Sequence, residues 1–89
     1  MAARVRYKAS VSKDLRRLGR GTAERLLSRL ERALGADPDA GEPLTGPYRG
    51  LRRLRIGDHR VIYSRGEDGV LVLRVAHRKD SYRGAPPKH

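Results

Sequence analysis

The stretch GLRRLRIGDHRVIY, residues 50–63, predicts a β-hairpin that carries an unusual number of arginines. Apolar and basic residues alternate on both sides of Gly57-Asp58, a dipeptide typical of a tight hairpin turn. A turn of this length places Arg55 directly opposite Arg60. Like charges on facing positions cost a few tenths of a kcal/mol, so this arrangement calls for an explanation.

Successive side chains of a strand point to opposite faces, which divides the hairpin into an apolar face and a basic face. The apolar face comprises Leu54, Ile56, Val61 and Tyr63, and the basic face comprises Arg53, Arg55 and Arg60. Arg52 and His59 point away from the basic face, and we interpret Arg52 as structural or peripheral. Guanidinium groups held on rigid strands form a suitable clamp for phosphate.

Composition supports an anionic partner. The chain has 89 residues, which predicts one domain, and its formal net charge is +11. Such an excess of basic residues is typical of proteins that bind polyanions, most often nucleic acid. The alternative is a solvated basic face, neutralised by acids folded over it from elsewhere; the candidates are Asp37, Asp39, Glu42 and Asp58.

Several other chemistries lack support in the sequence. The chain contains no cysteine, which excludes disulfides and cysteine zinc sites, and the three histidines lack metal-ligand spacing. Phosphate-loop, dinucleotide-binding and HExxH motifs are also missing. The N-terminus has no signal-peptide pattern and no apolar run is long enough to span a membrane, so we expect a cytoplasmic protein without a membrane partner.

The rest of the chain predicts two helices between a first strand and three later ones. The expected elements are a strand at 4–9, helices at 11–18 and 23–34, and strands at 51–56, 59–65 and 70–76. Thr22 is a suitable N-cap for the second helix. The last strand is almost continuously apolar, so we place it inside the sheet. We expect Leu44 and Tyr48 to pin the long connection, 35–50, to the body.

This order, β-α-α-β-β-β, predicts an α+β fold. We expect a mostly antiparallel four-stranded sheet with a two-helix hairpin packed on one face. The other face, which carries the arginines, is then left open. One domain covers residues 1–83, and residues 84–89 form a flexible C-terminal tail.

A second cluster of reactive side chains, HRKDSYR, occupies residues 77–83. His77 is a candidate general acid or base near neutral pH. Arg78 is suited to stabilising a pentacoordinate phosphate, and Tyr82 to stacking on a base or transferring a proton. The alternatives are a surface histidine, a tyrosine packed on the sheet, and solvated Lys79 and Arg83. The cluster gains significance if it folds beside the hairpin arginines.

Three segments together resemble the RelE/ParE superfamily of bacterial and archaeal toxins, and in particular its RelE-like mRNA interferase branch. They are KDLRRL, GLRRLRIGDHRVIY and VLRVAHRKDSYR, and the resemblance spans about residues 4–83. It implies a compact sheet with two helices on one face, related in shape to microbial ribonucleases. It also implies an endoribonuclease that cleaves mRNA, in many members within the ribosomal A site, and thereby inhibits translation.

The resemblance further implies the products, the partners and the roles of individual residues. The products are a 2′,3′-cyclic phosphate and a 5′-hydroxyl, no metal or cofactor takes part, and a cognate antitoxin blocks the enzyme. Arg60 and Arg78 would stabilise the scissile phosphate. Proton transfer would fall to Tyr82 or to His77. Arg53 and Arg55 would orient this phosphate or bind neighbouring ones. Lys79 and Arg83 are our additional candidates for binding phosphate.

Two other functions share this fold. One is a ParE-like toxin that inhibits DNA gyrase and cuts no RNA, and the other is an inactive toxin-like domain that only binds antitoxin or RNA. The arginine set favours the ribonuclease, because a gyrase inhibitor has no evident need of it.

Overall fold

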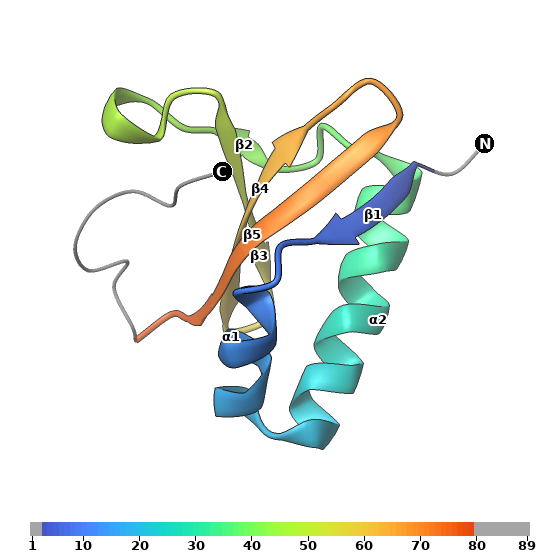
Figure 1. Ribbon diagram of the computed structural model, residues 1–89, viewed down its shortest axis with the longest axis vertical. Helices are drawn as coiled ribbons and strands as arrows, with labels where there is room; N and C mark the ends of the chain where they lie inside the picture. Colours follow the sequence, from blue (N-terminus) through green and yellow to red (C-terminus); the bar gives the residue numbers. More distant parts are fainter. Residues whose placement is uncertain (1–2, 80–89) are drawn as a thin grey trace.

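The computed structural model describes residues 3–79, which form an α+β fold with two helices and a five-stranded sheet (Figure 1). The elements are β1 (Arg4–Tyr7), α1 (Val11–Leu18), α2 (Arg20–Ala36), β2 (Glu42–Pro43), the 3₁₀ helix η1 (Gly46–Tyr48), β3 (Leu51–Ile56), β4 (His59–Arg65) and β5 (Gly69–His77). The strand order is β1-β5-β4-β3-β2. Strand β1 runs parallel to β5, and the other neighbouring strands are antiparallel.

The predicted fold class is confirmed, with one correction to the number of strands. The four expected strands are present, and β5 lies inside the sheet, between β1 and β4. The additional strand, β2, pairs with Arg52 and Arg53 of β3. Two residues are too few to show an alternating pattern, and a proline occupies one of them, so the sequence gives no signal for this strand.

The second helix, α2, begins earlier than the sequence predicted. The first helix, α1, has the predicted bounds, but α2 begins at Arg20, so Thr22 is inside its first turn and is not its N-cap. Gly19 separates the two helices with φ 85°, a conformation that glycine adopts without strain. Because this single residue reverses the chain, the second helix starts directly after it.

The main core lies between the helices and one face of the sheet. Figure 1 shows α1 and α2 side by side against this face. The buried members of this core are Val11, Leu26, Leu30, Leu34, Ile56, Val61, Tyr63, Val70, Val72 and Val75. Full burial of one such aliphatic side chain stabilises the fold by about 1.5–3 kcal/mol. The apolar face predicted for the hairpin is therefore the core face.

Polar contacts attach each helix to the sheet. The carboxylate of Asp14 in α1 accepts a hydrogen bond from the backbone N–H of Val75, 2.9 Å away, where β5 extends beyond the residues that pair with β1. The hydroxyl of Tyr7 in β1 donates to Glu31 in α2 at 2.5 Å. Burial and this hydrogen bond raise the pKa of Tyr7, so the hydroxyl keeps its proton.

The opposite face of the sheet is partly covered, which corrects the expectation that it is open. Leu51, Ile62 and Leu73 form a second buried cluster there, and the half-buried Leu44 and Tyr48 pack against it. The long connection is thus pinned to the body as predicted. Within residues 3–79, the uncovered part of this face is the end near the β3–β4 turn. None of the helices in the described part of the chain is long and apolar enough to cross a membrane.

Candidate phosphate-binding site

A hollow of about 380 Å³ lies at the tip of the β3–β4 hairpin, on the face opposite the helices. It is lined by Arg55, Gly57, Asp58, Arg60, Arg78 and Lys79. Its described lining therefore contributes four cations and a single carboxylate, and we refer to this hollow as the arginine hollow. Two of these cations come from the hairpin and two from the segment after β5.

Strand register and backbone hydrogen bonds hold these side chains together. Arg55 faces Arg60 across the hairpin, as the sequence predicts. The backbone N–H of Arg78 donates to the carbonyl oxygen of Asp58 at 2.7 Å, which fastens the end of β5 to the hairpin turn. This hydrogen bond brings Arg78, near the start of the cluster at 77–83, beside the hairpin arginines. The predicted functional significance of the cluster depends on this proximity.

The arginine hollow keeps most of its positive charge. Among residues 3–79, no carboxylate forms an ion pair with Arg55 or Arg60. Arg78 and Asp58 approach to 3.7 Å, with 61% and 65% of their side chains exposed. Exposed ion pairs contribute little, so this pair leaves Arg78 available to an anion. The surplus charge suits a phosphodiester, which arginine binds through two parallel N–H groups.

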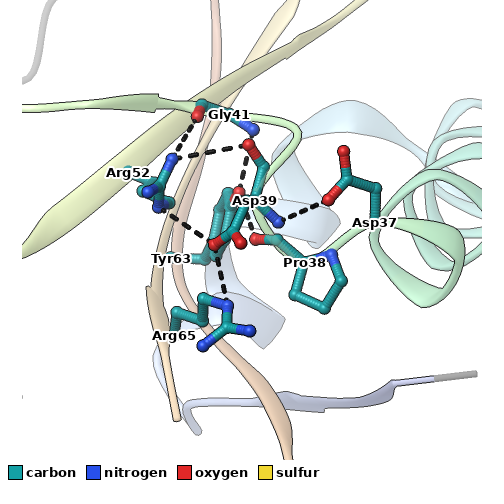
Figure 2. A network of polar contacts seen from close by, with 7 residues as sticks. All are labelled: Asp37, Pro38, Asp39, Gly41, Arg52, Tyr63 and Arg65. Atoms are coloured by element: carbon teal, nitrogen blue, oxygen red, sulfur yellow. Dashed lines mark hydrogen bonds and ion pairs between the residues drawn. The ribbon is translucent and has the colours of Figure 1, made fainter.

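At the other end of the hairpin, arginines are held by the chain itself (Figure 2). Arg52 Nη1 donates to the carbonyl oxygen of Gly41 at 2.7 Å. The carboxylate of Asp39 lies 3.7 Å from Arg52 Nε and 2.7 Å from Arg65 Nε. The structural interpretation of Arg52 is confirmed. An acid of the covering loop, Asp39, thus folds over the arginines at this end.

The buried Tyr63 completes this network, as Figure 2 shows. Its hydroxyl accepts a hydrogen bond from the N–H of Gly41 at 2.9 Å and donates one to the carbonyl oxygen of Pro38 at 2.8 Å. Burial raises the pKa of Tyr63 and keeps this donor protonated. A side chain at Gly41 would approach the tyrosine hydroxyl to 2.9 Å, so only glycine allows this close contact.

Arg53 lies between these two ends. Its Nη2 is 3.4 Å from the Glu42 carboxylate, and the two side chains are 42% and 78% exposed. Arg53 does not line the arginine hollow, although it shares a face with Arg55. The expected acids therefore divide: Asp39, Glu42 and Asp58 each approach an arginine, whereas the Asp37 carboxylate accepts a hydrogen bond from the backbone N–H of Asp39.

The structure does not bring His77 together with the arginines. His77 faces His59 across β4 and β5, with the ring centres 5.3 Å apart and the rings nearly perpendicular. By strand alternation both rings lie on the helix side, the side of Val61 and Val75. This confirms the predicted orientation of His59. Burial and the neighbouring imidazole lower the pKa of His59, so its ring is neutral near pH 7.

Two predicted site residues, Tyr82 and Arg83, lie outside the described residues, as does the predicted tail at 84–89. Within residues 3–79, no group of three or more His, Asp or Glu side chains is placed to hold a metal ion. Sequence reasoning did not place Asp58 in the site. The available signal was its position as the single acid in a basic hairpin turn.

The fold is shared with solved structures, among them a toxin and a protein from a toxin–antitoxin complex. The protein from the Mycobacterium tuberculosis toxin–antitoxin complex RelBE2 is 26% identical, with a TM-score of 0.80, over 88% of this chain and 100% of that one. An arginine-to-alanine double variant of the Escherichia coli toxin RelE is 20% identical, with a TM-score of 0.65, over 89% and 86% of the two chains. A conserved hypothetical protein from Helicobacter pylori is 21% identical, with a TM-score of 0.63, over 88% and 97%.

Sequence comparison defines the family. Residues 5–82 match the family described as the ParE toxin of type II toxin–antitoxin systems, so the chain belongs to this toxin family. No curated protein matches the sequence significantly. The predicted membership of the RelE/ParE superfamily is confirmed.

Proposed function

We propose that this toxin is an endoribonuclease that cleaves mRNA, on the ribosome, and that a cognate antitoxin neutralises it. The observation that carries the proposal is the arginine hollow, in which Arg55, Arg60 and Arg78 converge on one exposed space. Neither Arg55 nor Arg60 has a carboxylate partner among residues 3–79. A site that concentrates guanidinium groups without neutralising them is suited to the charge that builds up on a reacting phosphate.

The proposed reaction is an internal transesterification of RNA. The 2′-oxygen attacks the adjacent phosphorus, the bond from phosphorus to the 5′-oxygen breaks, and a 2′,3′-cyclic phosphate and a 5′-hydroxyl result. The 2′-hydroxyl loses a proton and the leaving oxygen gains one. Arg60 and Arg78 stabilise the extra negative charge of the pentacoordinate phosphate, and Arg55 and Lys79 bind neighbouring oxygens.

Proton transfer requires a group other than arginine, which stays protonated in proteins. Among the described residues of the arginine hollow, only Asp58 and Lys79 are able to exchange a proton. The family resemblance assigns this role to Tyr82 or to His77. The His77 ring lies on the helix side, so we propose that Tyr82 transfers the proton. Among the described residues of the arginine hollow, Asp58 is the one whose carboxylate is suited to act as a general base.

The proposed antitoxin partner is supported by charge and by a relative. The net charge of +11 suits an acidic segment laid over the toxin, and the Mycobacterium tuberculosis relative was solved as a toxin–antitoxin complex. An antitoxin that contacts the arginine hollow would occupy the position of the phosphate. Binding there would block the substrate directly.

A second candidate function is inhibition of DNA gyrase without RNA cleavage. The match to the ParE toxin family is the observation that favours it. Nothing in such an activity requires the convergence of Arg55, Arg60 and Arg78, so we rank it second. A domain that only binds antitoxin or RNA is the third.

Two assays with the wild-type protein separate these functions. Primer extension on mRNA from cells that express the toxin should show new ends at defined positions, carrying 5′-hydroxyl groups. A supercoiling assay with purified gyrase and toxin should show unchanged activity. Intact transcripts together with gyrase inhibition would establish the second candidate. Intact transcripts together with fully active gyrase would support the third candidate, a domain that only binds antitoxin or RNA.

A further inference from the structure

A second hollow, of about 300 Å³, lies on the helix side of the same hairpin turn. It is formed between α2, which contributes Arg25 and Arg29, and the turn, which contributes Gly57, Asp58 and His59. We call it the helix-side groove. The proposed chemistry does not use it, and the sequence analysis did not single out its two arginines.

The two arginines of this groove lie on one side of α2, because residues four apart on a helix are neighbours on its surface. Arg25 Nη1 lies 3.5 Å from the position that a Cβ of Gly21 would take, toward the start of the helix. Arg29 Nη1 lies 3.2 Å from the position that a Cβ of Gly57 would take, which places its guanidinium over the turn. Within residues 3–79, neither arginine forms an ion pair with a carboxylate.

The helix-side groove and the arginine hollow meet at the hairpin tip. Both are lined by Gly57 and Asp58, so the turn is the ridge between them. Among residues 3–79, their linings present six cations around this ridge and one carboxylate, that of Asp58; the cations are Arg25, Arg29, Arg55, Arg60, Arg78 and Lys79. A flexible polyanion that crosses the turn would meet positive charge on both sides.

We infer that single-stranded RNA wraps around the hairpin tip, with the reacting phosphate in the arginine hollow and further phosphates bound by Arg25 and Arg29 in the helix-side groove. This inference rests on the proposed function, because it extends the same RNA strand beyond the reacting phosphate. Arg25 and Arg29 then determine affinity for RNA and take no part in the chemistry.

The lining of the groove favours RNA over an acidic protein segment. Its apolar residues, Leu26 and Ile56, are only 4% and 7% exposed, so they offer a protein partner no apolar anchor. Protein interfaces depend on such buried anchors, whereas binding to a nucleic-acid backbone depends mainly on charge. His59 adds a half-buried aromatic ring between the charges, a suitable surface for a stacked base.

The test is RNA binding measured independently of cleavage. The probe is a fluorescent 2′-O-methyl oligonucleotide of about a dozen nucleotides, which spans the site and resists cleavage because it lacks the free 2′-hydroxyl. Affinity is measured over a range of KCl concentrations for the wild type and for Arg25→Gln/Arg29→Gln. The matched control is Arg4→Gln/Arg6→Gln, which removes the same charge from exposed positions on the far edge strand β1.

We expect the groove variant to bind the probe on the order of tenfold more weakly than the wild type. The slope of log affinity against log salt concentration should become shallower by about 1.4, which is about 0.7 for each of the two lost phosphate contacts. The control should lose much less affinity. Equal losses in both variants, or binding unchanged in the groove variant, would overturn the inference. Arg25→Lys/Arg29→Lys should retain the salt dependence.

This experiment separates the inference from the proposed function. If the wild-type protein binds the probe through Arg25 and Arg29 but cuts no mRNA, the RNA-binding role of the groove stands and the proposed endoribonuclease activity is refuted. If the protein cuts mRNA and the groove variant binds the probe normally, the endoribonuclease activity stands and the RNA-binding role of the groove is refuted. A groove variant that loses antitoxin binding but not RNA binding would assign the groove to the protein partner and overturn the inference.

Discussion

The two ends of the β3–β4 hairpin use the same residue type in opposite ways. At the open end of the hairpin, Arg52 and Arg65 contact the Asp39 carboxylate, and Arg52 also donates to a carbonyl oxygen of the covering loop. At the tip, Arg55 and Arg60 face each other with no carboxylate partner among residues 3–79. The first pair fastens a loop, whereas the charge of the second pair is exposed in the arginine hollow.

The difference shows that the number of arginines does not define a functional site. What distinguishes the tip is the surroundings of the charge: among residues 3–79, no loop covers it, and the one carboxylate that lines it, that of Asp58, is exposed. Like-charge repulsion between Arg55 and Arg60 is tolerated there because solvent screens it and because the rest of the sheet supplies the stability. Substitutions at the two ends should therefore separate activity from stability.

The largest effect should follow from Arg60→Ala combined with Arg78→Ala. Loss of a single charge-stabilising donor typically lowers the rate 10²–10³-fold, so we expect RNA cleavage to fall by about 10³-fold or more. The melting temperature should change little, because Arg78 is exposed and Arg60 is only half-buried. The measurement is cleavage of a fluorogenic RNA together with thermal unfolding. Retained cleavage in a folded variant would refute the roles assigned to the tip.

At the other end, Tyr63→Phe should lower stability by about 2 kcal/mol, because it leaves a buried N–H of Gly41 and the carbonyl oxygen of Pro38 without their partner. Urea unfolding measures this loss. RNA cleavage at a temperature where the variant is folded should match the wild type. A variant that is fully stable but inactive would mean that this end, too, takes part in function.

A smaller effect should come from the same substitution at two positions on one strand. Arg52→Gln removes the 2.7 Å hydrogen bond to Gly41 and should cost about 1 kcal/mol. Arg55→Gln removes repulsion with Arg60 and should change stability by only a few tenths of a kcal/mol, toward greater stability. If urea unfolding shows equal losses of unfolding free energy for the two variants, then arginines at the two ends of the hairpin contribute equally to stability.

The smallest effect concerns pH. The pKa of His59 is lowered in the folded state by burial and by the neighbouring His77, whereas the unfolded chain keeps the ordinary value of about 6.5. Below that value the unfolded state binds more protons, so stability is full above it and falls as the pH decreases. His59→Gln should weaken the decrease in unfolding free energy between about pH 8 and about pH 5. An unchanged pH dependence would exclude His59 as its source.

Several features of the fold that depend on neighbouring residues in the sequence were predicted correctly. The register of β3 and β4 followed from strict alternation and a glycine turn, and with it the pairing of Arg55 with Arg60. The helix at 11–18 and the buried last strand followed from their apolar spacing. These features depend on residues close together in the sequence, so a single sequence contains them.

Features that depend on distant residues were not predictable. Leu44 and Tyr48 were expected to pin the long loop, but the pairing of β2 with β3 and the face of the sheet that the loop covers were not foreseen, because the loop shows no periodicity. Alternation along β5 was obscured by a bulge between β4 and β5, at Ile62 and Tyr63, so the orientation of His77 was not foreseen. Nothing in the local sequence indicates that Arg29 lies over Gly57.

The position of β5 in the sheet determines when this protein is able to fold. β5 is the last of the described strands to be synthesised, yet it lies inside the sheet, where it pairs with both β1 and β4. Before it emerges, β1 has no neighbouring strand and the helices have only part of a surface to pack against. A nascent chain that lacks β5 therefore has no complete core and no complete arginine hollow, so this fold is completed only after β5 has been synthesised.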